Sequence, residues 1–232
     1  WDWPYSPDKT EPRLNQLDRD WIWYKAWFRY AWKADRNESD EKVYWTGELS
    51  DFFDTSRENA ALLLEAMEDM GECSPRILGR VGITEGNRQT SNLGMTMSQF
   101  TNVHRYRPNL ELWNSVARRG EQPEDYVKNE LSGTPHIGET PLDMITDVTA
   151  YAEHAMTLFQ TIDPEEIGRN KEEFLRIGSD LRGMKLIVDS YCYKIEAALF
   201  ILEYKLTMNS ECLGNIQLLK NALEPWEESM TL

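Results

Sequence analysis

Three histidines are the side chains of this sequence whose ordinary pKa lies near neutral pH, so they are the first candidates for acid–base chemistry. His136 lies in the loop-like segment SGTPHIGETP, with Glu139 three residues further on. A histidine and a carboxylate held in one loop can orient each other toward a ligand. The sequence offers no serine or cysteine in a nucleophile motif to complete a triad. We therefore predict ligand contact, not catalysis, at His136 and Glu139.

A second candidate is the polar segment EGNRQTSN, residues 85–92, followed by the basic segment HRYRP. Their amide and guanidinium groups can hydrogen-bond sugar hydroxyls or carboxylates, and can equally satisfy backbone groups in a long loop. The arginines add positive charge to a very acidic chain, which favours an acidic sugar or another carboxylate as ligand. The predicted ligand-binding residues are Asn87, Arg88, Gln89, Arg105, Arg107, His136 and Glu139.

No catalytic residue, metal ligand or cofactor site is predicted. A glycosidase needs two carboxylates about 5 to 9 Å apart across a cleft, and nearly every Asp and Glu here fits helix capping or a solvated helix face. Cys73, Cys192 and Cys212 lack the spacing of a zinc or redox site. We expect buried thiols, with a disulfide between Cys192 and Cys212 as the alternative.

The composition limits the classes of partner. The chain has 232 residues, 41% of them hydrophobic, and a formal net charge of −15, enough apolar material for one large domain. Nucleic acids and anionic membranes bind through clustered lysines and arginines, so the acidic balance argues against both. The sequence has neither a bilayer-spanning run nor a signal segment, and it begins Trp-Asp-Trp-Pro. This start is typical either of a fragment or of a chain trimmed of what preceded it.

The elements that position these residues are predicted to be helices. Segment 18–32, DRDWIWYKAWFRYAW, carries four tryptophans, two tyrosines and a phenylalanine, spaced along two neighbouring helical faces. A helix that is apolar around so much of its circumference is expected to be central, so most of these rings are predicted to lie in a core. Further helices are expected from a Ser39 cap to Phe53, from Thr55 to about Met70, and from Ser74-Pro75 onward.

The C-terminal half carries a sustained seven-residue repeat, the seam of a left-handed bundle. One helix is expected from Thr140-Pro141, a second from Asp163-Pro164 to about Thr207, and a third from Cys212 to Trp226. In the second helix the repeating positions are Phe174, Ile177, Leu181, Met184, Val188, Tyr191, Ile195, Ala198 and Leu202. Gly178 and Gly183 in that helix mark either close packing or a kink.

The predicted fold is therefore all-α, an aromatic-rich set of short helices packed on a long antiparallel three-helix bundle. Its parts are an extended arm at 1–16, an N-terminal helical lobe with long polar loops at 17–139, and the bundle lobe at 140–232, together forming one domain.

The segment WYKAWFRYAWKADRNESDEKVYWTGELSDFF resembles the start of the C-terminal helical domain of bacterial α-glucuronidases, which follows the catalytic barrel in these polysaccharide-degrading glycoside hydrolases. The matching residues are Arg29, Tyr30, Ala31, Trp32, Asp35 and Trp45. The resemblance implies a non-catalytic module of a larger carbohydrate-active enzyme, which supports the barrel and mediates dimerisation or contributes loop residues to a saccharide site. The chain contains no barrel, so the family's catalytic carboxylates have no positions here.

The implied partners are a catalytic barrel of the same polypeptide or gene, a polysaccharide or oligosaccharide, and a second copy of the chain. The implied location is periplasmic or secreted. One alternative is a self-standing helical binding protein or enzyme for an acidic saccharide or other small carboxylated ligand. Another is a helical interaction protein that dimerises through a face of its bundle.

Overall fold

The structure is a computed structural model that describes Leu17, 20–82, 97–101, 119–209, Asn221, Pro225, Glu227 and Glu228. Within these residues the fold is all-α, as predicted, and strand pairing is limited to an isolated bridge between Gly120 and Glu139. The helices are α2 (Trp21–Trp32), α3 (Glu38–Phe53), α4 (Arg57–Ile77), α5 (Met97–Phe100), α7 (Pro123–Ser132), α8 (Pro141–Thr161) and α9 (Lys171–Thr207), with a π-helical turn η1 (Leu78–Gly82) and a 3-10 turn η3 (Pro164–Glu166).

The chain falls into two compact units. The first unit comprises the described residues up to Ala61 together with Pro164–Leu175, and the second comprises those of Leu62–Asp163 and from Arg176 onward. In the first unit, the apolar side of α3 supplies Trp45, Leu49 and Phe53 to the core. Phe53 meets Phe174 edge to face, with ring centroids 6.1 Å apart.

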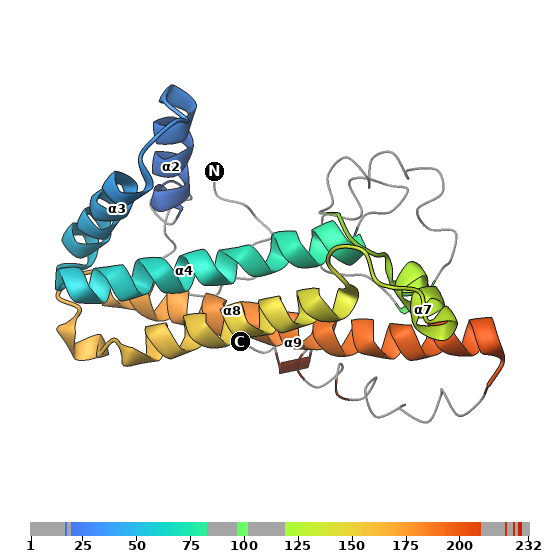
Figure 1. Ribbon diagram of the computed structural model, residues 1–232. Helices are drawn as coiled ribbons and strands as arrows, with labels where there is room; N and C mark the ends of the chain where they lie inside the picture. The colour runs from blue at the N-terminus through green and yellow to red at the C-terminus, as the bar shows by residue number, and fades with distance from the viewer. Residues whose placement is uncertain are drawn as a thin grey trace. The chain divides into compact units, whose positions relative to one another are not determined.

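The second unit is built on three long helices that run side by side, α4, α8 and α9 (Figure 1). The predicted heptad seam is confirmed: in α9 the side chains of Leu181, Val188, Tyr191, Ile195 and Ala198 are buried in one cluster with residues of α4 and α8. In the described core, α4 is thus the helix packed with α8 and α9. Of the predicted third bundle helix, from Cys212 to Trp226, the structure describes only Asn221 and Pro225. The predicted domain boundary at 139/140 stays a prediction.

The two glycines of α9 have different surroundings. A Cβ on Gly178 would lie 2.5 Å from the ring of Phe159, whereas a Cβ on Gly183 would meet nothing within 4 Å. Of the two readings left open by the sequence, Gly178 is therefore a close-packing point. Gly183 has no packing contact of this kind.

One observed helix start agrees with the start predicted from the sequence, and three others differ from the predictions. Thr140 caps α8 in a capping box with Asp143, and Pro141 follows it as predicted. At Asp163-Pro164 the chain forms only η3, and α9 begins at Lys171. For α4 the amide of Asn59 donates to the Ser56 hydroxyl, one residue beyond the predicted Thr55 cap. Helix α3 is capped by Asn37 and not by Ser39.

Helix α4 also runs through Pro75, where a separate short helix was expected. Proline lacks an N–H and normally breaks a helix interior. Here it lies near the end of α4, and the backbone changes to the wider π-helical pattern of η1 directly after Ile77. The proline thus marks the end of the α-helical pattern and not the start of a new helix.

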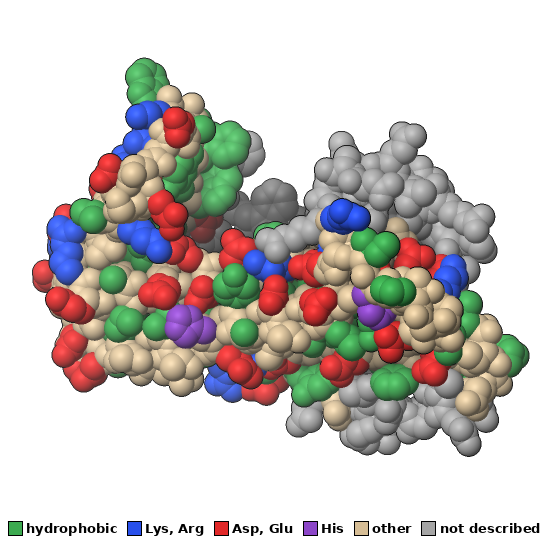
Figure 2. Space-filling model, in the orientation of Figure 1, with side chains coloured by type: hydrophobic (Ala, Val, Ile, Leu, Met, Phe, Trp, Pro, Cys, Tyr) green, Lys and Arg blue, Asp and Glu red, His purple; other side chains and the backbone are tan. Residues whose placement is uncertain are grey.

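Helix α2 contradicts the prediction that its aromatic rings are mostly core. None of its residues is buried, and hydrophobic side chains line it in Figure 2. Its large exposed side chains are Trp23 (58% exposed), Trp27 (60%), Phe28 (69%), Tyr30 (39%) and Trp32 (89%). Among the described residues, the helix packs on α3 through pairs such as Trp21 with Phe52 and Tyr30 with Trp45. Spacing indicates which faces are apolar but not how many neighbours cover them.

Two cysteines lie in the core of the second unit as free thiols, Cys73 on α4 and Cys192 on α9. Burial raises the pKa of Cys73 to about 11 and that of Cys192 to about 12. The expectation of buried thiols is confirmed for these two, and Cys212 lies outside the described residues.

Candidate functional site

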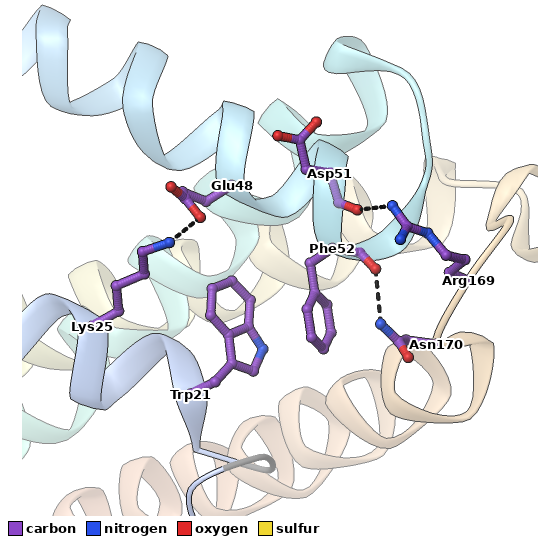
Figure 3. Close-up of a pocket in the computed structure, with 7 residues that line it drawn as sticks. All are labelled: Trp21, Lys25, Glu48, Asp51, Phe52, Arg169 and Asn170. Atoms are coloured by element: carbon purple, nitrogen blue, oxygen red, sulfur yellow. Dashed lines mark hydrogen bonds and ion pairs between the residues drawn. The ribbon is translucent and has the colours of Figure 1, made fainter.

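An open pocket in the first unit combines aromatic and polar side chains (Figure 3). It has a volume of about 430 Å³. Helix α2, the end of α3 and the segment after η3 build it. The lining residues are Trp21, Lys25, Glu48, Asp51, Phe52, Arg169 and Asn170.

The aromatic part of the pocket is a stacked pair. The rings of Trp21 and Phe52 lie 4.5 Å apart between centroids, at an interplanar angle of 26°. Trp21 is the first residue of α2 and Phe52 is the penultimate residue of α3, so the pair joins the ends of two helices. Both side chains are half-buried. Together they form a semi-rigid apolar wall, since stacked rings restrict each other's rotation.

The polar part of the pocket lies around this wall. Lys25 of α2 makes an ion pair with Glu48 of α3, and this carboxylate raises the pKa of the lysine. On the other side, the Arg169 guanidinium donates to the backbone carbonyl of Asp51. The Asn170 side-chain amide donates to the carbonyl of Phe52 over 2.8 Å.

The segment that carries Arg169 and Asn170 is fixed to the end of α3 by its backbone. The amides of Gly168 and Arg169 donate to the carbonyls of Asp54 (3.2 Å) and Phe53 (2.9 Å). A Cβ at position 168 would lie 2.8 Å from the Asp54 carboxylate and 2.9 Å from its carbonyl oxygen, so this approach requires glycine. Asn170 adopts a positive φ of 53°, which asparagine tolerates better than most residues.

Helices α2 and α3 are held together by residues that also carry the family resemblance. Arg29 binds Glu41 through two hydrogen bonds of 2.7 Å, and its guanidinium lies 3.5 Å from the Tyr44 ring centroid. The bonds from Arg29 hold the pKa of Glu41 below its ordinary value. The Trp45 indole donates to the Tyr30 hydroxyl over 3.0 Å. This network positions Trp21 and Lys25 against α3.

His136 lies in the second unit between two carboxylates. Its Nδ1 is 2.7 Å from Glu121 and its Nε2 is 2.6 Å from Glu130. The imidazole stacks on Tyr126, with centroids 4.8 Å apart. Hydrogen bonds to Glu121 and then to Glu130 raise the pKa of His136.

Glu121 is the buried member of this group, at 5% exposure. Burial by itself would raise the pKa of Glu121, but hydrogen bonds from His136, the Ile137 amide and the Asn129 side chain together lower it. A protonated imidazole between charged carboxylates is a clamp that ties the 133–140 loop to α7. This arrangement leaves neither ring nitrogen available as a general base.

Glu139 has a different partner from its neighbour His136. The side chain of Arg80 is fully buried and donates to Glu139 through Nη2 (2.6 Å) and Nε (3.0 Å). Gly120 lies against this pair, where a Cβ would come within 2.1 Å of the Glu139 carbonyl oxygen and 2.7 Å of the Arg80 guanidinium. The ion pair fixes the isolated bridge between the two loop segments.

Of the predicted ligand-binding residues, the structure describes only His136 and Glu139, and it assigns them to two separate ion-paired groups. The others lie outside the described residues. The seven pocket residues of the first unit were not predicted. They are separated by up to 149 positions (170 − 21) along the chain, and no local motif connects them.

Within the described residues, no group of three or more His, Cys, Asp or Glu side chains is arranged to hold a metal ion. None of the described helices is long and apolar enough to cross a membrane.

Comparison with known proteins gives a strong similarity among solved structures. No family model and no curated protein matches the chain. Among solved structures it is similar to a GH138 enzyme targeting pectin rhamnogalacturonan II, with a TM-score of 0.88 and 38% sequence identity over 99% of this chain. The chain spans only 33% of that enzyme's length. The fold of this chain is therefore related to a part of a glycoside hydrolase, and the more specific resemblance to α-glucuronidases stays a prediction.

Proposed function

We propose that the chain acts as a non-catalytic helical module of a larger glycoside hydrolase that degrades plant cell-wall pectin, where it supports the catalytic domain. The observation that carries the proposal is the similarity of nearly the whole chain, at 38% identity, to a third of an enzyme targeting rhamnogalacturonan II. A match of that extent favours a part with a place in a larger enzyme over a self-standing protein.

The exposed face of α2 supports this role. Trp27, Phe28 and Trp32 are each at least 60% exposed, and a contiguous apolar surface of this kind usually marks a contact with another protein or domain. The other side of the same helix is fixed to α3 by Arg29 and Tyr30. The exposed rings are therefore presented on a firmly held helix, as a docking surface requires.

The pocket supports a non-catalytic role. Glycoside hydrolysis uses two carboxylates on either side of the scissile bond. Of the two carboxylates at the pocket, Glu48 is engaged in an ion pair with Lys25. We therefore assign the hydrolytic chemistry to another domain.

The test compares three preparations: the longer polypeptide, the same polypeptide without these 232 residues, and the chain alone. We expect the chain alone to release no sugar from rhamnogalacturonan II. We expect the truncated polypeptide to lose most of its activity or its solubility, and to recover activity when the chain is added in trans. Hydrolysis by the chain alone would show the proposal to be wrong. So would a truncated polypeptide with unchanged activity and melting temperature, or a gene without a catalytic domain.

A further inference from the structure

We propose that the pocket of the first unit is a saccharide subsite that binds one neutral pyranose ring against Trp21 and Phe52. The choice of saccharides as the ligand class rests on the proposed function, whereas the ring size, its orientation and its charge are inferred from the pocket itself. The subsite would hold one sugar residue of a longer glycan.

The size of the pocket fits such a ligand. Its volume of about 430 Å³ lies within the range typical of small-molecule sites. The pocket is open, so a bound ring can continue into further sugar residues on either side. An open site of this kind can hold one ring of a longer chain as well as a single sugar.

The aromatic pair provides the apolar contact. One face of a pyranose ring carries mainly C–H groups, whose slight positive charge is attracted to the negative face of an aromatic ring. Trp21 and Phe52 are half-buried and stacked, so each covers one face of the other and a sugar can stack only on an outward face of one ring. The second ring holds that first ring in place before a ligand arrives. A preformed wall reduces the conformational entropy lost on binding.

The polar groups match the hydroxyls of a sugar. A hydroxyl both donates and accepts hydrogen bonds, and the pocket presents both kinds of partner. Arg169 and Asn170 are exposed donors, and the exposed carboxylate of Asp51 is an acceptor. The bonds from Arg169 and Asn170 to backbone carbonyls fix their orientation.

The charges of the pocket favour a neutral ring over an acidic one. Two cationic side chains, Lys25 and Arg169, are balanced by two anionic ones, Glu48 and Asp51. The lysine charge is already matched by the adjacent glutamate. Arg169 in turn lies 4.0 Å from the Asp54 carboxylate. A ligand carboxylate would therefore add negative charge beside Asp51 where both cations already have anionic partners, whereas a hydroxymethyl group would meet no repulsion.

The experiment titrates the 15N-labelled chain with methyl β-galactopyranoside, and in parallel with the matched uronide in which a carboxylate replaces the hydroxymethyl group. The nine tryptophans give separate indole N–H signals, and a Trp21→Phe chain identifies the Trp21 signal by its absence. We expect the galactoside to shift this signal with a Kd on the order of 1 mM. The uronide should bind no more tightly than the galactoside.

Two variants make the test specific. Asp51→Ala changes an exposed helix position and should weaken galactoside binding roughly three- to tenfold, because an acceptor is lost. Trp23→Ala removes a neighbouring exposed ring that does not line the pocket, and it should leave the Kd unchanged. A galactoside that shifts no Trp21 signal, an Asp51→Ala chain with unaltered affinity, or tighter binding of the uronide would each overturn the inference. Because no activity is measured, these outcomes are independent of whether the chain supports a catalytic domain.

Discussion

At the scale of single residues, the two predicted site residues that the structure describes are each held by oppositely charged neighbours, and their contact with a ligand stays a prediction. His136 was expected to face a ligand because it lies in a loop framed by glycine and proline. The structure places it between Glu121 and Glu130, with both ring nitrogens engaged. Glutamates at positions 121 and 130 could be seen in the sequence. Their convergence on one imidazole depends on how the loop folds back on α7, which no local pattern encodes.

We expect His136→Gln to destabilise the chain more at about pH 5.5 than at about pH 9. The pKa of His136 is raised above 6.5, so its contribution to stability is complete below that pH and is lost as pH rises through the folded pKa. The pKa of Glu121 is lowered below 4.5, so its contribution is complete above that pH and is lost as pH falls. The clamp is therefore strongest between these values. Urea unfolding of both chains at the two pH values measures the difference. An equal loss of unfolding free energy at the two pH values would show that the charge of the imidazole does not contribute to stability.

A second residue-scale prediction concerns the buried pair of Arg80 and Glu139. We expect Arg80→Met to lower the free energy of unfolding by about 3 kcal/mol, because removing one partner leaves the other charge poorly compensated. Arg182→Met is the matched control, since Arg182 and its partner Glu228 are both exposed (55% and 44%) and a pair of that kind contributes only about 0–1 kcal/mol. Urea unfolding near neutral pH compares the two. Equal losses would contradict the assignment of Arg80 as the anchor of this loop.

At the scale of helices, the extent to which neighbouring helices cover a helix explains both the correct prediction for α9 and the wrong one for α2. The heptad positions of α9 were predicted correctly because that helix has long neighbours along its length, so each repeating apolar residue meets a core. The rings of α2 were misassigned because, among the described residues, that helix packs on α3 through some of its rings and leaves the others exposed. Sequence periodicity reports which residues share a face, and burial additionally depends on a neighbour that the sequence of one helix does not specify.

The glycines of α9 give a matched pair of helix-scale predictions. We expect Gly178→Ala to destabilise the chain by about 1 to 3 kcal/mol, because the new methyl group would overlap the Phe159 ring. We expect Gly183→Ala to stabilise it by roughly 0.5 to 1 kcal/mol, since alanine is the better helix former and meets no neighbour. Both are measured by urea unfolding. If both substitutions changed the free energy of unfolding in the same direction, helix propensity alone, and not packing, would govern the stability effect at these positions.

At the scale of the whole molecule, the exposed face of α2 should matter little to the chain alone and much to its assembly. We expect Trp32→Lys to change the free energy of unfolding of the isolated chain by no more than about 0.5 kcal/mol, as is usual for an exposed position. In trans, the same change should weaken binding to the remainder of the enzyme at least about tenfold, because buried tryptophans often dominate interfaces.

The matched control for this prediction is Leu206→Lys, which adds the same charge at an exposed apolar position on α9. It should leave binding to the remainder of the enzyme unchanged. Calorimetric titration of each variant provides the comparison. Normal binding by Trp32→Lys would assign the exposed face to another partner, such as a second copy of this chain, which sedimentation analysis of the isolated chain would detect.

The all-α class and the bundle seam could thus be predicted, and the pocket could not. Its aromatic wall consists of Trp21 at the start of α2 and Phe52 near the end of α3. Arg169 and Asn170, which complete its lining, lie more than a hundred positions later in the sequence. Each of these residues has an ordinary local explanation in the sequence, as a helix residue or a turn residue. Only the fold brings them together.

The two buried thiols allow the opening of the helical core to be measured. A thiol reagent attacks the thiolate, and neither Cys73 nor Cys192 offers one to solvent while the helices remain packed. In a Cys212→Ser chain, the rate at which such a reagent labels these positions therefore reports how often the bundle opens under native conditions, without denaturant. Under the proposed function, recording that rate with and without the remainder of the enzyme would measure how far assembly slows the opening of the helical core.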